Sequence, residues 1–153
     1  MKLKKKIHIL LVEDNEGDIV LTKEALEEIA MDITLSVTKD GKQAIDFLNQ
    51  NEEYKSATIP DLVLLDINLP KKNGHEVLQY IKENEKLKHI PVIMLTTSSS
   101  ERDIDLTYSN HANCYITKPS DVNEYIEALS ATVHFWLNIC KLPNQKKMLN
   151  DNG

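Results

Sequence analysis

Glycine is scarce in this sequence. The 153 residues include four glycines, which lie far apart at positions 17, 41, 74 and 153. Glycine-rich phosphate-binding loops need closely spaced glycines, because backbone amides must approach the phosphate. The spacing therefore excludes nucleotide binding of the GxGxxG and GxxxxGK(S/T) kinds.

The residues that most often bind zinc are few and scattered. Cys114 and Cys140 are the two cysteines, without a CxxC pair, and the five histidines show no HxxxH spacing. Structural zinc sites need such close spacing. We therefore expect no zinc site, two buried and reduced thiols, and a cytoplasmic protein.

Long apolar runs and an excess of basic residues are also absent. The first apolar run, Ile7 to Val12, stops at Glu13 and Asp14, too soon for a signal-peptide core or a membrane span. Lys plus Arg number 18 against 24 Asp plus Glu, which gives a net charge of −6, whereas a nucleic-acid binder is usually basic. We expect neither a membrane nor a nucleic acid as a partner.

The apolar residues form five short runs, each followed by a helical pattern. Short apolar runs bounded by polar residues predict buried strands, and apolar spacings of three and four predict helices. The predicted strands are 7–12, 33–37, 62–65, 92–95 and 114–116, and helices are expected near 19–29, after Asp40, from Gly74, over 101–109 and from about Ser120. Five alternations predict an α/β fold, a single doubly wound five-stranded parallel sheet with helices on both faces.

Polar residues follow four of these strands. Glu13-Asp14, Asp66 and Thr96 come directly after three apolar runs, and Thr117-Lys118-Pro119 follows another. Any one of them alone is typical of a turn or a helix cap. Ligands of such sheets bind beyond the carboxyl ends of the strands, so we expect these side chains to meet there.

These residue types together favour phosphoryl chemistry. Three crowded carboxylates raise a pKa unless a cation joins them, and oxygen ligands without His or Cys suit Mg²⁺. A lysine supplies positive charge for an anion, and the Thr96 hydroxyl can donate a hydrogen bond to it. A carboxylate, Mg²⁺, a lysine and a hydroxyl are the groups that phosphoryl transfer to an aspartate requires.

With these residues in place, the sequence resembles a response-regulator receiver domain of two-component signalling, over about Ile7 to Leu137. The resemblance implies the flavodoxin-like receiver fold, (βα)5, and a stand-alone phosphoprotein that signals through a phosphorylation-dependent conformational switch. The matching residues are Glu13-Asp14, Asp66 with Pro70 and Gly74 after it, Thr96, and Tyr115 to Pro119.

The resemblance also assigns the acceptor and the metal ligands. It implies that Asp66 accepts a phosphoryl group from a sensor histidine kinase. Asp14, Asp66 and the backbone carbonyl of Asn68 are expected to bind Mg²⁺, and Glu13 to act through a metal-bound water. The expected domain is a phosphoacceptor and not an enzyme beyond self-catalysed transfer and autodephosphorylation.

A second group of residues is implied to form the switch. Lys118 is expected to pair with the phosphate, Thr96 to move and hydrogen-bond it, and Tyr115 to turn inward. The Lys118–Pro119 peptide bond is implied to be cis, which would aim the lysine into the pocket.

Longer matching segments resemble a subfamily, the small single-domain response regulators that pair with bacterial phytochrome histidine kinases. A phytochrome kinase is the partner that this closer resemblance implies, although regulators of this type also serve kinases with other sensors. The segments are 11–18, the polar insertion before Pro60, 68–74, 113–118, and 135–137 with Leu142-Pro143.

The chain divides into three expected parts. Residues 1–6 form a basic, solvated N-terminal tail, residues 7–140 the receiver domain, and residues 141–153 a short C-terminal tail with no output domain. The signal is therefore expected to leave through contact with a downstream protein. Phe135, Trp136 and Ile139 add apolar surface to the last helix, which indicates either a homodimer face or a fold-back over the domain's own core.

Three other functions compete with this interpretation. A haloacid-dehalogenase-like phosphohydrolase also uses Asp and Mg²⁺, but it usually has a second acid where this chain has Asn68. A Ser/His/Asp hydrolase would need a GxSxG elbow, which is absent. A phosphorylation-independent binding module on the same fold is disfavoured because Asp14, Asp66, Thr96 and Lys118 are intact.

Overall fold

The computed structural model describes residues 6–97 and 100–139. The expected N-terminal tail up to residue 5, Ser98, Cys140 and the expected C-terminal tail therefore lie outside the described residues. The strands are β1 Lys6–Val12, β2 Asp32–Thr38, β3 Leu62–Asp66, β4 Val92–Thr96 and β5 Cys114–Thr117. The helices are α1 Glu16–Glu27, α2 Gly41–Leu48, α3 Gly74–Glu83, α4 Glu101–Ser109 and α5 Val122–His134.

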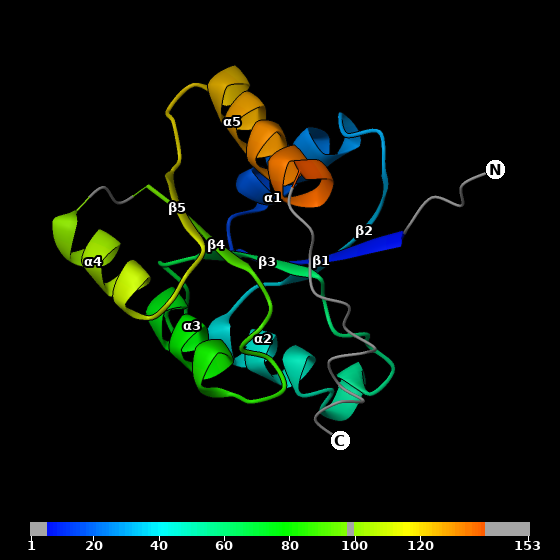
Figure 1. Ribbon diagram of the computed structural model, residues 1–153, viewed down its shortest axis with the longest axis vertical. Helices are drawn as coiled ribbons and strands as arrows, with labels where there is room; N and C mark the ends of the chain where they lie inside the picture. Colours follow the sequence, from blue (N-terminus) through cyan, green and yellow to red (C-terminus); the bar gives the residue numbers. More distant parts are fainter. Residues whose placement is uncertain (1–5, 98–99, 140–153) are drawn as a thin grey trace.

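The five strands form one parallel sheet in the order β2-β1-β3-β4-β5 (Figure 1). The predicted doubly wound five-stranded sheet is therefore confirmed. Strand order reverses between β1 and β3, which are neighbours although β2 lies between them in sequence. In that pair Val12 is level with Leu65, so Glu13 and Asp66 come next on adjacent strands. The switch point of the topology thus brings two acidic residues together.

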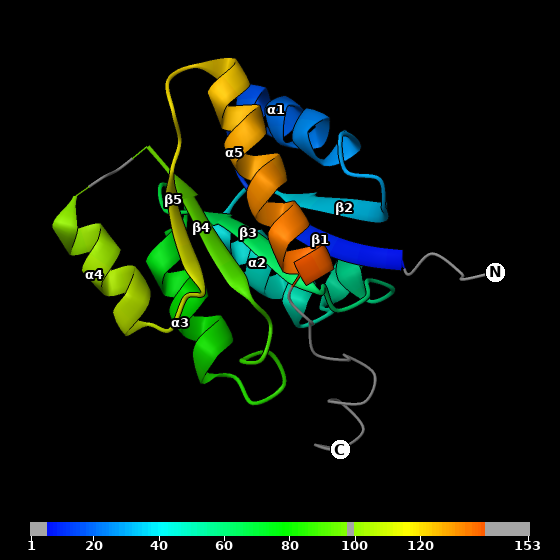
Figure 2. The ribbon, with the colours of Figure 1, turned by 45° about the horizontal axis from the view of Figure 1, so that its top comes forward.

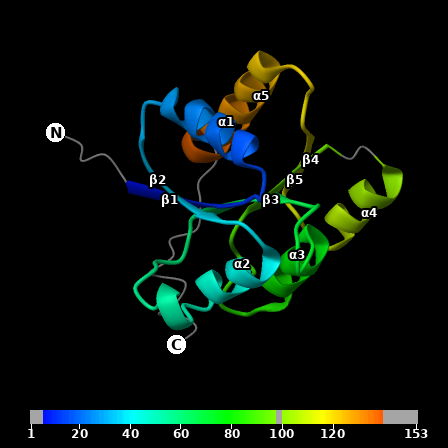
Figure 3. The same cartoon turned by 180° about the vertical axis from the view of Figure 1, so that it is seen from behind.

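Helices cover both faces of the sheet, as Figures 1 and 3 show. Helices α1 and α5 lie side by side on one face, and α2, α3 and α4 lie on the other (Figure 2). Alternate residues of each central strand point to opposite faces, because successive side chains in a strand alternate. In β3, Leu62 and Leu64 pack beneath α1 and α5, whereas Val63 and Leu65 pack against α2 and α3. Both faces are thus filled with apolar side chains, which explains the continuous apolar runs.

Local capping residues set where the helices begin. Asp40 accepts a hydrogen bond from the backbone N–H of Gln43, which confirms it as the cap of α2. Asn73 forms a capping box with Glu76 at the start of α3, so the helix begins at Gly74 as predicted. Ser100 caps α4, where its hydroxyl oxygen accepts from the N–H of Asp103.

The last helix differs in detail from the sequence prediction. Helix α5 begins at Val122, close to the expected start near Ser120, and Asp121 is its cap, because the Asp121 carboxylate accepts from the N–H of Glu124. The helix changes to a π-helical segment over Phe135–Ile139. The predicted loop before Pro60 contains a short 3-10 turn at Glu52–Tyr54. Across the described ranges, every helix is too short or too polar to cross a bilayer.

Candidate functional site

Four strand ends build the predicted polar site. The N–H of Glu13 donates to the carbonyl of Thr38, 3.0 Å away, which fixes the chain as it leaves β1. Asp66 is the last residue of β3, and Thr96 is the last residue of β4. The N–H of Lys118 donates to the carbonyl of Thr96 at 2.7 Å. The backbone thus holds all four chain segments at one edge of the sheet.

Glu13, Asp14 and Asp66 come together as a carboxylate cluster. One oxygen from each lies within 4.8 Å of the others. Glu13 and Asp66 are buried, at 2% and 7% exposure, whereas Asp14 faces solvent. Clustered hard oxygen donors with an open side suit a divalent cation that keeps several waters. The residues present therefore fit the predicted cation, and we call Glu13, Asp14, Asp66 and Lys118 the acidic site.

Lys118 reaches into this cluster with its ammonium almost fully buried. Its Nζ forms ion pairs with Glu13, with Asp18 Oδ2 at 2.8 Å, and with Asp66 Oδ2 at 3.6 Å. Burial by itself lowers the pKa of Lys118, but the hydrogen bonds to Asp18 and Glu13 and the charge of Asp66 outweigh it, so the pKa is raised. The lysine is therefore a fixed positive charge beside Asp66.

One carboxyl of the cluster has a perturbed pKa, as the crowding predicts. Burial raises the pKa of Glu13 to about 7; Lys118 opposes this rise and Asp66 adds to it. The main cause is thus desolvation, and repulsion between carboxylates is secondary. Without a metal, Glu13 therefore holds its proton more tightly than an exposed glutamate does.

Asp18 is the site residue that the sequence interpretation did not identify. It lies in the first turn of α1, and Lys118 contacts it more closely than it contacts Asp66. In the sequence, Asp18 stands out only as a further acid in the first turn of α1. Its contact with Lys118 joins residues 100 positions apart, so no local pattern marks it as a site residue.

The other predicted residues lie around the acidic site. The N–H of Asn68 donates to Asp66 Oδ1 at 3.3 Å, which holds the loop after β3 against the carboxylate. Thr96 is fully buried. Tyr115 is half-buried and packs against the core on the face of α2 and α3.

The expected cis bond between Lys118 and Pro119 is wrong. The described residues contain no cis peptide bond, so this bond is trans. The trans form of an X–Pro bond is favoured by roughly 0.5–1 kcal/mol. The lysine side chain is long enough to reach Glu13 and Asp18 from the trans backbone, so the pocket does not require the rarer isomer.

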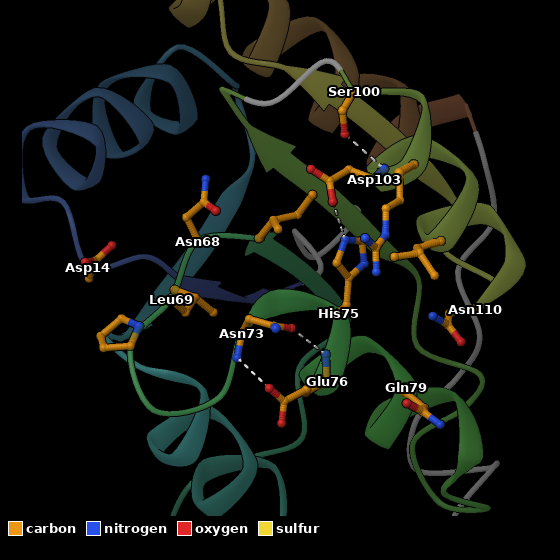
Figure 4. A pocket seen from close by; sticks show the side chains of 14 residues that line it. Asp14, Asn68, Leu69, Asn73, His75, Glu76, Gln79, Ser100, Asp103 and Asn110 are labelled. Carbon is orange, nitrogen blue, oxygen red and sulfur yellow. Dashed lines mark hydrogen bonds and ion pairs between the residues drawn. The ribbon is translucent and has the colours of Figure 1, made fainter.

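A groove of about 880 Å³ opens beside the acidic site (Figure 4). Asp14 and Asn68 lie at one end of it, and α3 and α4 form its walls. His75 on α3 and Asp103 on α4 meet across it, with His75 Nε2 3.1 Å from Asp103 Oδ1. The groove gives a reactant access to the exposed side of the acidic site.

Relatives in sequence share most of the chain. Response regulator Rcp1 of Synechocystis sp. is 44% identical over 135 residues, which cover 88% of this chain and 92% of Rcp1. The probable methanogenesis regulatory protein FilR2 of Methanothrix harundinacea is 40% identical over 135 residues, which cover 88% of this chain and 86% of FilR2.

Solved structures share the fold. The phosphorylated cyanobacterial phytochrome response regulator RcpA superimposes with a TM-score of 0.89 at 44% identity, over 92% of this chain and all of RcpA. The Mn²⁺-bound form of Rcp1 gives a TM-score of 0.87 at 43% identity, over 90% of this chain and 99% of Rcp1. A family model described as the response regulator receiver domain matches residues 9–130. The strand ends, the acidic site and these matches agree, and the chain belongs to the response regulator receiver domain family.

Proposed function

We propose that this receiver domain accepts a phosphoryl group on Asp66 with the help of Mg²⁺, and signals by changing its protein contacts. The observation that carries the proposal is the pairing of a buried carboxylate with a buried ammonium. Lys118 Nζ lies 3.6 Å from Asp66 Oδ2, and Glu13 and Asp14 complete the cluster. Two further carboxylates beside an acceptor are an electrostatic cost unless a cation binds, so the cluster itself argues for the metal.

Each residue then has a chemical role. A carboxylate oxygen of Asp66 attacks phosphorus, and the bond from phosphorus to the donor's leaving group breaks. Asp14, Asp66 and the backbone carbonyl of Asn68 would hold Mg²⁺, with Glu13 acting through a water. When bound, the cation neutralises charge on the phosphoryl oxygens.

The switch residues respond after transfer. The Lys118 ammonium pairs with a phosphoryl oxygen, and the Thr96 hydroxyl donates a hydrogen bond to another. Tyr115 then moves further into the space beside Thr96. The phosphoryl group contacts Lys118 and Thr96 only when these side chains have rearranged. Phosphorylation therefore shifts the population toward the rearranged state.

The proposed partner is a sensor histidine kinase, and within that class a bacterial phytochrome kinase. The support is similarity to RcpA, a cyanobacterial phytochrome response regulator, at 44% identity. Purified kinases from the same organism, assayed for initial phosphotransfer rate, test this pairing. We expect the phytochrome kinase to be the fastest donor, and equal rates from all kinases would contradict it.

The phosphohydrolase alternative gains no support from the site. The position two residues after Asp66 holds Asn68, whose amide cannot act as a general acid or base. At most, the domain catalyses its own phosphorylation and dephosphorylation. The expected division into tail 1–6, receiver domain 7–140 and tail 141–153 changes by one residue, because Lys6 is the first residue of β1. With that change, and with a cytoplasmic location, the division is part of the proposal.

Intact mass after incubation with acetyl phosphate and Mg²⁺ tests acceptance directly. We expect one added phosphoryl group, stable in acid and labile in base. Asp66→Asn and a sample with EDTA should both lack it. If neither acetyl phosphate nor beryllofluoride produces an adduct or complex, the phosphorylation-independent binding module becomes the better account.

We also propose a homodimer contact through the last helix. Phe135 is 45% exposed, and its ring packs edge-on against the ring of Trp136, with 6.2 Å between the ring centroids. Trp136 is half-buried against the domain's own core, so the fold-back interpretation fits it, whereas Phe135 is left for a partner. The side chain of Ile139 lies outside the described part of the chain.

Sedimentation of the wild type, Phe135→Ala and Trp136→Ala, with and without beryllofluoride, tests this contact. We expect a dimer in the wild type and a monomer in Phe135→Ala with an unchanged unfolding midpoint. Trp136→Ala should also lower the midpoint, because it removes core contacts. A wild type that stays monomeric in both states would contradict the dimer.

A further inference from the structure

The nearest aspartate to the site lysine is not the proposed acceptor. Lys118 Nζ lies 2.8 Å from Asp18 Oδ2, and 3.6 Å from Asp66 Oδ2. The first distance is that of a charge-assisted hydrogen bond, and the second is beyond one. The lysine is therefore hydrogen-bonded to α1, through Asp18, and to β1, through Glu13.

Asp18 is held in place on both sides of its backbone. Its N–H donates to Oδ1 of Asn15, the cap residue of α1, at 3.0 Å. Its carbonyl accepts from the Thr22 hydroxyl at 2.8 Å, and that hydroxyl lies 3.3 Å from the Tyr125 hydroxyl of α5. The carboxylate thus projects from a fixed turn, so its contact with Lys118 is prearranged.

We infer that Asp18 is a positioning residue that holds Lys118 in the unphosphorylated protein and competes with the phosphoryl group for it. The inference rests on the proposed function, because it concerns the same acceptor. A phosphoryl group on Asp66 adds negative charge and oxygen acceptors within reach of Lys118. The ammonium has three N–H groups, and Asp18 and Glu13 already occupy two of them. Moving toward the phosphoryl oxygens weakens the contact with Asp18, so that contact opposes the phosphorylated arrangement.

The chain provides a matched control in the same helical turn. Glu16 is also acidic and also lies in the first turn of α1, but it pairs with Lys39 on the surface. Its side chain is 71% exposed, against 28% for Asp18. Neutralising Glu16 changes the net charge equally and leaves Lys118 untouched.

The test is a titration with beryllofluoride, which stands in for the phosphoryl group, at saturating Mg²⁺. Bound fluorine is observed by ¹⁹F NMR, which reports on the complex itself. We expect Asp18→Asn to bind about two to five times more tightly than the wild type, the range for removing one partly exposed competing ion pair. Glu16→Gln should bind as the wild type does, and Asp18→Glu should return affinity toward it.

Thermal unfolding of each variant checks that the fold is intact, and Asp18→Ser replaces Asp18→Asn if the latter does not fold. If the wild type forms a complex and Asp18→Asn binds beryllofluoride no more tightly than the wild type, the inference is overturned. The proposed function is then unaffected. Equal tightening by Glu16→Gln also overturns it, because the effect would then be net charge alone. A wild type that forms no complex overturns this inference, and it removes the proposed function as well if acetyl phosphate also gives no adduct.

Discussion

The carboxyl ends of the strands and their amino ends carry different polar groups. We call these two sides of the sheet the carboxyl edge and the amino edge. At the carboxyl edge, Glu13 and Asp66 lie against the buried ammonium of Lys118. At the amino edge, β1 carries His8, whose ring is surrounded by hydroxyls. His8 Nε2 lies 2.8 Å from Ser36 Oγ, and His8 Nδ1 lies 2.9 Å from Thr58 Oγ1.

The amino edge holds one carboxylate, Asp61, within a network of hydrogen bonds. The N–H of His8 donates to Asp61 Oδ2 at 2.9 Å, and the N–H of Asp61 donates to the His8 carbonyl at 2.8 Å. We call His8, Ser36, Thr58 and Asp61 the amino-edge network. Burial lowers the pKa of His8, against the raising effects of Asp61 and of a hydrogen bond to the backbone of Ile59.

The comparison shows that the amino-edge network stabilises the fold, whereas the acidic site is suited to binding and chemistry. The amino-edge network satisfies polar groups without a buried ion pair. The acidic site concentrates charges that burial disfavours, and Glu13 has a raised pKa as a result. Such a site is expected to gain stability from a ligand that neutralises its charge.

The largest expected effect on stability comes from Gly74, whose backbone packs against the end of β3 at the carboxyl edge. A Cβ on Gly74 would lie 2.2 Å from the Asp66 carbonyl oxygen and 2.6 Å from the Ile67 Cα. Neither backbone atom can move cheaply, so we expect Gly74→Ala to lower the free energy of unfolding by about 3 kcal/mol or more in urea denaturation.

Gly17→Ala is the matched control for that substitution. Its Cβ would meet only the side chain of Asn15, at 3.2 Å, within a helix that favours alanine. We expect a change within about 1 kcal/mol. Similar losses in the two variants would contradict the close approach of the α3 start to the acceptor strand.

A smaller effect is expected from Mg²⁺, and it should depend on pH. The folded pKa of Glu13 is about 7, above its ordinary value of 4.5, so the metal-free fold binds the extra proton. Its contribution to stability is full below pH 4.5 and is lost as pH rises to about 7. Mg²⁺ at 100 times its dissociation constant should restore about 2.7 kcal/mol.

Unfolding midpoints at pH 5.5 and pH 8, with and without Mg²⁺, measure this effect. The gain should be larger at pH 8, where Glu13 is ionised, and Asp14→Asn should reduce it. A gain that is larger at pH 5.5, or unchanged in Asp14→Asn, would count against the acidic site as the place where the cation binds.

The smallest effect concerns the amino edge. Because the folded pKa of His8 lies below 6.5, the unfolded chain takes up a proton first as pH falls. Stability should therefore decrease below pH 6.5, by at most about 1.4 kcal/mol per pH unit. We expect His8→Gln to flatten this part of the profile in urea denaturation, whereas Ser36→Ala, which keeps the titrating ring, should retain it. Equal slopes in the wild type and His8→Gln would show that His8 is not the group responsible.

The sequence predicted the five strands because their apolar runs are a local pattern. It also predicted that Glu13, Asp14 and Asp66 meet, because the carboxyl ends of parallel strands lie on the same side of the sheet. Buried parallel strands need continuous apolar runs, and Asp66 and Thr96 end theirs as expected. Asp18 was missed because its contact with Lys118 joins residues 100 positions apart, which no local pattern reveals. The Lys118–Pro119 isomer was predicted wrongly, because it depends on how the whole loop reaches the site.

Two aspartates flank the apolar residues of β3, and they allow the most direct test of the account. Asp66 is the last residue of the strand, at the carboxyl edge, and Asp61 directly precedes its first residue, at the amino edge. After acetyl phosphate treatment, borohydride reduction converts an aspartyl phosphate to homoserine, which tandem mass spectrometry locates in the peptide 56–71. The account predicts homoserine at position 66 and none at position 61. Homoserine at position 61, or at both positions alike, would contradict it.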